Sequence, residues 1–327
     1  MNIYDIAEKC GVSIATVSRV LNNNPNVSAT TRARVMAVME EEKYTPNAFA
    51  RGLGTGSMKM VGVLCSTIRD PHHAEMLAYV EEHLRQGGMH LLLRYAGETA
   101  EESRQALHYM LQNHVEAILL IGAIAPQEED DTLASVAAQV PVILLDGDVT
   151  IPGVYCVSGD HKSAVSDLVG LLMRRQRRRI LLLHNTLTYG CLQKIQGYTD
   201  AHTTYGLTVD PDLIVAVDSD LDAVNRCIKQ LLVKRVTFDA IIGTEDVLAL
   251  GAQKALQRTG LNMPIIGLNN SLAARCATPE LSSVDCDPKK LCETGFGLLG
   301  ALLEGKEVPS HTMLPTQLIE RDSFRNN

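Results

Sequence analysis

The pattern of apolar and polar positions changes near residue 57. Before it, the chain shows short helical patterns and no strand pattern. After it, short apolar runs alternate with amphipathic stretches, an order typical of parallel β-sheets covered by helices on both faces. The apolar runs are 61–65, 90–95, 117–122, 141–146, 179–184, 213–217, 240–243 and 264–268. The helical stretches are 74–86, 100–113, 128–139, 162–173, 192–205, 221–233 and 247–258. This pattern fits either one closed barrel or two open sheets.

Composition narrows the class of protein. The 327 residues are 46% hydrophobic, with 24 Gly and 12 Pro, as in a globular chain long enough for two or three domains. The 30 Lys and Arg against 38 Asp and Glu give a net charge of −8. This charge excludes a protein that coats nucleic acid without specificity, so a DNA-binding function would have to lie in one segment.

Location and redox state follow from simple features. The polar and acidic start of the chain predicts no signal peptide. The longest apolar run, 117–125, is too short to cross a bilayer. None of the 8 cysteines forms a pair with CxxC spacing. We interpret them as reduced thiols and expect a cytoplasmic protein with no membrane partner.

The first 57 residues predict a helix-turn-helix. The pattern indicates helices over 3–10 and 14–21, separated by a turn at Gly11. Ala7 is small enough to let the two helices approach each other, and Val17 can fill the angle between them. This spacing is the one that a DNA-binding helix-turn-helix requires, although an ordinary three-helix segment would also satisfy it.

The second of these helices would present a free face to DNA. Its exposed residues can touch base edges and phosphates: Ile14, Ala15, Thr16, Ser18, Arg19 and Asn22. Residues 1–57 hold six basic and five acidic residues, a net charge of only +1. A single copy would therefore bind DNA weakly, and we expect two copies to bind each DNA site together.

Several motifs in this segment resemble the headpiece of the lactose-repressor/galactose-repressor (LacI/GalR) family. They are Tyr4-Asp5-Ile6-Ala7, Gly11-Val12-Ser13, Thr16-Val17-Ser18-Arg19-Val20-Leu21-Asn22, Val27-Ser28 and Tyr44-x-Pro46-Asn47. The resemblance implies that Ile14 and Ala15 select bases and that Arg19 reads a guanine. It assigns contacts with phosphates or bases to Ser13, Thr16 and Asn22.

The resemblance also implies a hinge helix over 47–53. Ala50 would lie on its packed face, and Leu53 would insert between base pairs in the minor groove and kink the DNA. A simple core leucine is the alternative for Leu53. Gly52 and Gly54 each lower the helix propensity by about 1 kcal/mol, so we expect this helix to form only on DNA. The alternate glycines do not complete a dinucleotide fingerprint, and we predict no cofactor.

For the rest of the chain, the family implies an α/β fold. The N-terminal helix-turn-helix headpiece would be followed by two doubly wound parallel-sheet subdomains of the periplasmic-binding-protein-like type, with an effector in the cleft between them. The expected boundaries are 1–57 for the headpiece and hinge helix, 58–327 for the effector-binding and dimerisation region, about 59–157 and 288–316 for its first subdomain, and about 158–285 and 317–327 for its second.

The resemblance places the effector pocket at the carboxyl ends of strands, where such sheets hold their ligands. The candidate residues are Ser66, Asp70, His72, His73, Asp146, Lys194, Ser219, Glu245 and Asn269. His72 and His73 stand where the family often has aromatic residues. Lysine 194 replaces the usual arginine, glutamate 245 the usual asparagine, and asparagine 269 the usual aspartate.

These departures change the chemistry of the pocket. Lys194 offers a point charge in place of a planar two-pronged donor, and it could pair with Glu245 in the empty site. The chain has no Trp to stack on a sugar face. Many polar groups and few aromatic ones favour a hydroxyl-rich or small polar effector. The alternative is an unresponsive cleft whose polar groups are structural.

We therefore expect a DNA-binding transcriptional repressor that works as a homodimer on a pseudo-palindromic operator. The chain lacks the extra apolar heptads that tetrameric relatives append, which favours a dimer. It contains no HExxH, GxSxG or Walker motif and no His/Cys/Glu set with ligand spacing, so we predict neither catalysis nor a metal site. The alternatives are an α/β sugar-modifying enzyme that carries a headpiece and a solute-binding module.

Overall fold

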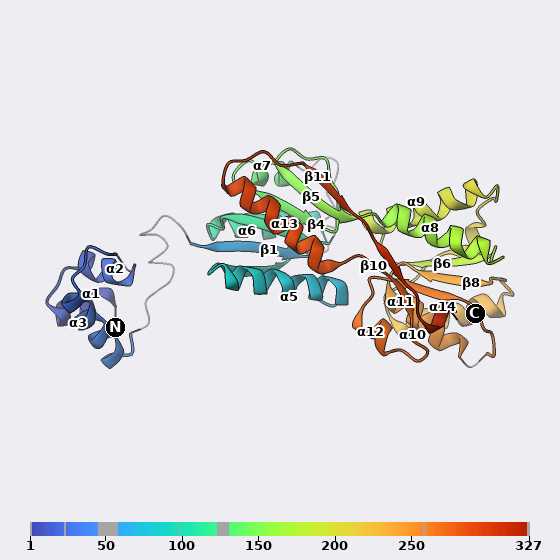
Figure 1. Cartoon of the computed structure of the whole chain (residues 1–327), viewed down its shortest axis with the longest axis horizontal. Coiled ribbons are helices and arrows are strands. Elements are labelled where there is room, and N and C mark those ends of the chain that lie inside the picture. Colours follow the sequence, from blue (N-terminus) through green and yellow to red (C-terminus); the bar gives the residue numbers. More distant parts are fainter. Residues whose placement is uncertain are drawn as a thin grey trace.

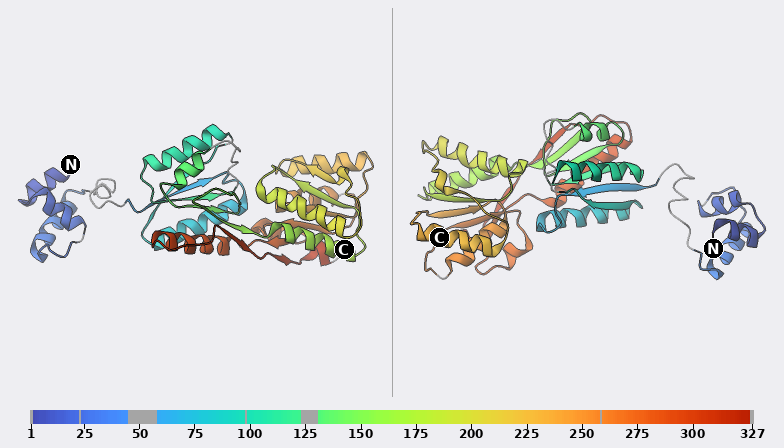
Figure 2. Two further views of the ribbon diagram at one scale, coloured as in Figure 1. Left: turned by 90° about the horizontal axis from the view of Figure 1, so that it is seen from above. Right: turned by 180° about the vertical axis from the view of Figure 1, so that it is seen from behind.

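The computed structural model describes residues 2–22, 24–44, 58–97, 99–122, 131–257 and 259–325. It contains a unit of three short helices and a larger region with two six-stranded sheets (Figure 1). Each sheet has helices on both of its faces (Figure 2). Within these ranges, no helix is both long and apolar enough to cross a membrane.

The N-terminal unit is the predicted helix-turn-helix with a third helix. Its elements are α1 (Ile3–Cys10), α2 (Ile14–Leu21) and α3 (Ala29–Glu41). Asn2 and Asp5 form a capping box at the start of α1, and Gly11 ends the helix with a φ of 59°, a conformation that favours glycine. The helices share one core, formed by Ile6, Ala7, Cys10, Val17, Val20, Val35 and Met39.

The first sheet has the strand order β11-β5-β4-β3-β1-β2, and all its neighbouring strands are parallel. Its strands are β1 (Met60–Cys65), β2 (His90–Tyr95), β3 (Ala117–Ile121), β4 (Val142–Leu145), β5 (Val154–Gly159) and β11 (His311–Leu314). One face is covered by α5 (Pro71–Gln86) and α13 (Pro288–Leu303). The other face is covered by α6 (Ala100–Gln112) and α7 (Thr132–Ala137). We call this unit the first subdomain.

The second sheet has the strand order β12-β10-β9-β8-β6-β7 and is parallel except for β12, which runs antiparallel to β10. Its strands are β6 (Ile180–His184), β7 (Ile214–Ala216), β8 (Ala240–Gly243), β9 (Ile265–Leu268), β10 (Ser282–Asp285) and β12 (Gln317–Ile319). Helices α8 (His161–Arg174), α9 (Tyr189–Thr204) and α14 (Asp322–Arg325) pack on one face. Helices α10 (Leu221–Val233), α11 (Asp246–Leu256) and α12 (Leu272–Cys276) pack on the other, and the short 3-10 helix η1 (Pro211–Leu213) precedes β7. This unit is the second subdomain.

The chain crosses between the two subdomains three times. It leaves the first sheet at the end of β5 and enters α8, returns from β10 to α13, and crosses again from β11 to β12. The last crossing is visible as the red segment that runs from one sheet to the other (Figure 1). Three short connections between two independently packed cores are an arrangement that permits the subdomains to move relative to each other.

The structure has two open sheets, and the eight predicted apolar runs all become strands within one or two residues of their expected ends. Four strands were not predicted: β5, β10, β11 and β12. Two of them carry polar residues in buried or pairing positions, such as Ser282, Ser283 and Gln317. The long helix α13 was also missed. Strand β5 pairs with β11 and β10 pairs with β12, partners far away in the sequence, and local pattern does not reveal this stabilisation.

All 8 cysteines are free thiols, as expected from their spacing. Six of them are buried, Cys227 is half-buried and Cys276 is exposed. Burial raises the pKa of several of these thiols, among them Cys156 to about 11 and Cys292 to about 12. Such thiols stay protonated at neutral pH and behave as small apolar side chains.

Helices α8 and α9 pack closely enough to require glycine at position 197. A Cβ added to Gly197 would overlap the backbone carbonyl of Lys162 on α8, and backbone cannot move aside as a side chain can. The side chain of Tyr198, the next residue, is fully buried and donates a hydrogen bond to the carbonyl of Ile180 (2.7 Å). This contact anchors α9 to strand β6.

The substitution Gly197→Ala tests this packing. The added methyl group forces α8 and α9 apart, so we expect the free energy of unfolding to fall by about 1–3 kcal/mol. Gly297→Ala is the matched control, because Gly297 also lies inside a helix but a Cβ there has no neighbour within 4 Å. Urea unfolding measures both variants. Equal losses in the two would contradict the close approach.

Candidate functional site

Helix α2 presents a free face opposite its buried one. Val17 and Val20 point into the small core, whereas Ile14, Ala15 and Arg19 are exposed. Ile14 is 40% exposed at the first position of the helix. An exposed apolar and a cationic side chain on one short helix can contact a thymine methyl group and a guanine edge.

Hydrogen bonds fix both ends of α2. The Ser13 hydroxyl accepts from the backbone N–H of Thr16 and lies 2.9 Å from its hydroxyl. At the other end, the Arg32 guanidinium of α3 donates to the carbonyls of Val20 (3.3 Å) and Asn24 (2.7 Å). Asn22 is exposed at the C-cap and Ser18 is half-exposed. The predicted hinge helix, with Ala50 and Leu53, lies outside the described residues.

A cavity of about 650 Å³ lies between the two subdomains of the larger region. The loop that follows β1 supplies one wall, and the segments after β6, β7 and β8 supply the other. All of these are carboxyl ends of parallel strands, where open α/β sheets hold their ligands. The lining residues are Thr67, Arg69, Asp70, Pro71, Asn185, Thr186, Ala216, Val217, Asp218, Ser219, Glu245 and Val247.

A hydrogen-bonded cluster of three side chains forms the polar wall of the second subdomain. The Asn185 amide donates to Glu245 (2.6 Å) and to Ser219 (2.8 Å), and the Ser219 hydroxyl donates to Glu245 (2.9 Å). Ser219 and Glu245 are predicted site residues, and Asn185 is one that the sequence analysis missed. A carboxylate held by two neighbours in this way can accept further hydrogen bonds from hydroxyl groups.

The predicted pairing of Lys194 with Glu245 is wrong. The buried ammonium of Lys194 donates to the backbone carbonyl of Thr244 (2.9 Å), and Glu245 is bound by Asn185 and Ser219. The reason is geometric: Lys194 lies on α9, from which it reaches the carboxyl end of β8. A backbone carbonyl there satisfies it at lower desolvation cost than a buried ion pair would.

Asp146 connects the two subdomains. It follows β4 in the first subdomain with a φ of 59°, and its Oδ1 lies 2.8 Å from Nε2 of His161, the first residue of α8 in the second. Its Oδ2 lies 3.3 Å from Nε2 of His72 on α5, an ion-pair contact whose geometry falls short of a hydrogen bond. His161 was not among the predicted site residues, because its partner precedes it by one strand and a loop.

Burial and neighbouring charges shift the pKa values of Asp146 and His72 in opposite directions. Burial alone would raise the pKa of Asp146, but the charge and hydrogen bond of His161, together with the close contact of His72, hold it well below the usual value. Burial would likewise lower the pKa of His72, but the carboxylate of Asp146, helped by Asp70 and opposed by Lys194, raises it. The carboxylate is therefore ionised and favours a protonated His72.

The remaining predicted residues follow β1 or β9 or lie on α5, and only Asp70 among them lines the cavity. Asp70 lines the cavity and caps α5 by accepting from the N–H of His72 (2.8 Å). Ser66 and His73 flank Gly122 at the end of β3, and His73 Nδ1 lies 3.2 Å from the carbonyl of Thr67. Asn269 follows β9 with a φ of 95°, and its side-chain oxygen is buried without a hydrogen-bond partner among the described residues.

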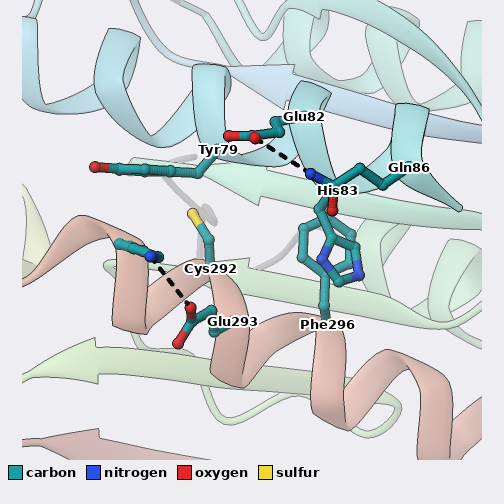
Figure 3. A pocket seen from close by; sticks show the side chains of 8 residues that line it. Tyr79, Glu82, His83, Gln86, Cys292, Glu293 and Phe296 are labelled. Carbon is teal, nitrogen blue, oxygen red and sulfur yellow. Dashed lines mark hydrogen bonds and ion pairs between the residues drawn. The ribbon is translucent and has the colours of Figure 1, made fainter.

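A second cavity, of about 260 Å³, lies between α5 and α13 (Figure 3). The His83 ring stacks on Phe296, with 3.9 Å between centroids and 17° between planes. Around the stack, Gln86 donates to Glu82 (3.2 Å), and Lys289 Nζ lies 3.9 Å from a Glu293 oxygen. Only the first subdomain lines this cavity, and none of the predicted site residues does.

A helix-turn-helix joined to a two-subdomain α/β region with a polar cleft defines a DNA-binding regulator of the ligand-binding type. Residues 2–47 match the family of bacterial regulatory proteins of the lacI family. Residues 58–287 match the family of periplasmic binding proteins and the sugar binding domain of the LacI family. The chain therefore belongs to the LacI family of bacterial transcriptional regulators.

Relatives and solved structures agree with this assignment. An HTH-type transcriptional regulator of Lachnoclostridium phytofermentans is 37% identical, with 98% of each chain covered. Catabolite control protein A of Priestia megaterium is 31% identical, over 100% of this chain and 99% of the relative. A crystal structure of the Lac repressor dimer bound to operator and an anti-inducer superimposes with a TM-score of 0.86, at 25% identity, over 99% and 98% of the two chains. The protein is a DNA-binding transcriptional regulator and not an enzyme, which removes the sugar-modifying alternative.

The contact of His72 with Asp146 makes stability depend on pH with a defined sign. The pKa of His72 is raised on folding, so protonation of His72 stabilises the folded state. This stabilisation is fully present below the unfolded pKa of about 6.5 and is lost as pH rises through the folded pKa. We expect the unfolding free energy of the wild type to decrease on raising the pH from about 6.5 more than that of His72→Gln.

Urea unfolding at several pH values measures this difference. His108→Gln is the control, because His108 is an exposed histidine on α6. It should keep the pH dependence of the wild type. If His72→Gln keeps it as well, His72 does not stabilise the fold through its charge.

Proposed function

We propose that this regulator is a repressor that binds a pseudo-palindromic operator as a homodimer and that a small polar, sugar-like effector controls its operator affinity. The observation that carries the proposal is the cavity whose polar walls come from both subdomains. A ligand there contacts both subdomains at once and shifts the equilibrium between their arrangements by its differential affinity. We infer that the protein acts in the cytoplasm, where its DNA lies.

In this proposal the headpiece comprises residues 1–57, and α2 is its recognition helix. Ile14 and Ala15 would contact bases, Arg19 a guanine, and the remaining polar residues phosphates or bases: Ser13, Thr16, Ser18 and Asn22. The exposure of Ile14 and Arg19 supports these roles. Ala50 and Leu53 would act in the hinge, where Leu53 would kink the DNA.

Two headpieces per operator follow from electrostatics. The net charge of about +1 over 1–57 gives one copy little affinity for phosphates, whereas two linked copies add their binding energies. The similar Lac repressor structure is described as a dimer bound to operator. A two-fold dimer requires two half-sites related by the same symmetry, so the operator would be pseudo-palindromic.

The chemistry of the cleft supports a hydroxyl-rich effector. Glu245 and Asp70 offer carboxylate oxygens, Asn185 and Ser219 offer amide and hydroxyl groups, and the lining also contains apolar Val217. Deeper in the second subdomain, the Asn269 oxygen and the Thr244 hydroxyl are buried without hydrogen-bond partners among the described residues. Buried polar atoms of this kind gain when a ligand or water completes their hydrogen bonds. The family model that matches this region is that of a sugar binding domain.

The proposed division of the large region is 58–327, with a first subdomain of about 59–157 and 288–316 and a second of about 158–285 and 317–327. The contacts that cross this division include Asp146 with His161 and Asp148 with Tyr189. Closing or opening the cleft would change the separation of the two first subdomains of a dimer, and with it the spacing of the headpieces. Typical coupling of this kind amounts to about 1–3 kcal/mol.

The substitution Arg19→Ala tests the role of α2 as the recognition helix. Loss of a bidentate contact with a guanine should cost about 1–3 kcal/mol of operator affinity and relax the preference at one base pair. Selection from a random duplex library followed by titration at fixed salt measures both effects. Lys229→Ala is the control, because it removes the same charge from an exposed position on α10. Unchanged affinity and base preference in Arg19→Ala would remove Arg19 from base reading.

Glu245→Ala tests the effector cleft. Thermal unfolding in a panel of mono- and disaccharides and their phosphate esters should identify at least one that stabilises the wild type, by about 2.7 kcal/mol at 100 times its Kd. Glu245→Ala should lose that shift and the change in operator affinity, while its effector-free operator affinity stays within about threefold of the wild type.

The matched control is Glu307→Ala, since Glu307 is an exposed carboxylate outside the cavity. It should respond to the same sugar as the wild type does. No stabilisation by any member of the panel would contradict a sugar-like effector. A full response in Glu245→Ala would move the binding site elsewhere.

A further inference from the structure

Three side chains of different chemistry converge at one side of the first subdomain. Asp148 follows β4, Cys156 lies on β5 and His311 lies on β11. A carboxylate oxygen, the sulfur and a ring nitrogen of the three all lie within 4.8 Å of one another. The three residues are widely separated along the chain, and no sequence motif connects them.

The sheet itself positions two of the three. Strands β5 and β11 are parallel neighbours, and His311 is the register partner of Cys156. Register partners project to the same side of a parallel pair. The thiol of Cys156 is buried, whereas His311 is exposed, so the cluster extends from the protein interior to solvent. An ion could therefore reach it without unfolding of the subdomain.

Existing contacts already hold the third group in place. Asp148 Oδ1 lies 2.7 Å from His311 Nδ1, and Asp148 Oδ2 accepts a hydrogen bond from the Tyr189 hydroxyl (3.1 Å). The Cys156 sulfur lies 3.4 Å from the N–H and 3.6 Å from the carbonyl oxygen of Val149. Each of the three side chains thus has a partner that fixes its rotamer, as ligands in metal sites require.

We propose that Asp148, Cys156 and His311 form a binding site for Zn²⁺, with a fourth position open to water. Sulfur, nitrogen and oxygen together are ligands of a borderline-soft ion, whereas Mg²⁺ and Ca²⁺ take oxygen ligands. Zinc bonds of about 2.0–2.3 Å in a tetrahedral arrangement separate ligand atoms by roughly 3.3–3.8 Å. His311 is exposed and has room to move away from Asp148 by the roughly 0.6–1.1 Å that this spacing needs, starting from 2.7 Å. Zinc would displace the proton of the Cys156 thiol, as it does at other cysteine ligands.

The site lies at a contact between the two subdomains, so a bound ion would affect both. Tyr189 belongs to α9 of the second subdomain, and it donates to the same carboxylate that would bind the ion. Asp148 can bind zinc through Oδ1 and still accept this hydrogen bond through Oδ2. Both β5 and β11 also run directly into the second subdomain. The site is separate from the cavity proposed for the effector, because none of its three ligands lines that cavity.

The test uses the full chain after treatment with a chelator. Titration with Zn²⁺ against a chromophoric competitor gives stoichiometry and affinity, and titration with Co²⁺ reports on the thiolate through its charge-transfer absorption in the near ultraviolet. We expect one Zn²⁺ per chain and a cobalt–thiolate band. Cys156→Ser and His311→Ala should each weaken binding more than tenfold, and Cys156→Ser should abolish the band.

Matched controls separate this site from adventitious binding. Cys276→Ser removes the exposed thiol of α12, and His90→Ala removes an exposed histidine of β2; neither should change the affinity. Since His311 is exposed, His311→Ala should fold even if Cys156→Ser does not, and thermal unfolding verifies this for each variant. No binding by the wild type, no cobalt–thiolate band, or an equal loss in Cys276→Ser would overturn the proposal.

Discussion

The carboxylate of Asp146 is the group on which the arrangement of the two subdomains depends. It belongs to the first subdomain, contacts His72 there, and is held at 2.8 Å by His161 of the second. A buried carboxylate is costly unless oppositely charged or hydrogen-bonding groups surround it, so loss of either histidine would leave Asp146 with only one of its two compensating partners. The three connections of the chain permit movement of the subdomains, and this contact, together with that of Asp148 and Tyr189, stabilises the arrangement in the structure. The cavity keeps its polar walls on both sides as long as that arrangement holds.

The headpiece depends on a different balance. Its three helices share a core of only a few apolar side chains, which fixes α2 but leaves one of its faces free. The exposed isoleucine and arginine of this face can distinguish DNA sequences by shape and by hydrogen bonding. The net charge of the headpiece, by contrast, gives little affinity for DNA. The small size of this unit and its low charge support the proposal that a second copy takes part in operator binding and that the larger region brings the two copies together.

Local pattern was sufficient for most of the fold. Apolar runs such as 90–95 and 240–243 become strands with the predicted bounds, and the helix over 221–233 is found as predicted. Strands β10 and β12 were missed because Ser282, Ser283 and Gln317 interrupt the apolar signal, and their stability comes from pairing across the sheet. The carboxyl ends of strands, by contrast, were placed well enough that Asp70, Ser219 and Glu245 all line the cavity.

Contacts between distant segments could not be predicted in the same way. His161 was missed because a histidine at the start of a helix has no recognisable signal, and only the fold brings it to Asp146. The pairing of Lys194 with Glu245 was wrong because complementary charge does not show which backbone carbonyl lies nearer. The cluster of Asp148, Cys156 and His311 depends on the pairing of β5 with β11, and β11 itself was not recognised.

We propose that a ligand between the subdomains changes their arrangement and thereby changes operator affinity. The most direct measurement combines the two quantities in one sample of the full chain. Encoded spin labels at exposed positions in α6 and α10, such as Glu101 and Lys229, report the distance between the subdomains by pulsed electron paramagnetic resonance while operator binding is titrated with the sugar. We expect the distance distribution and the operator affinity to change together, with the same midpoint in sugar concentration. A change in operator affinity with an unchanged distance distribution would contradict it.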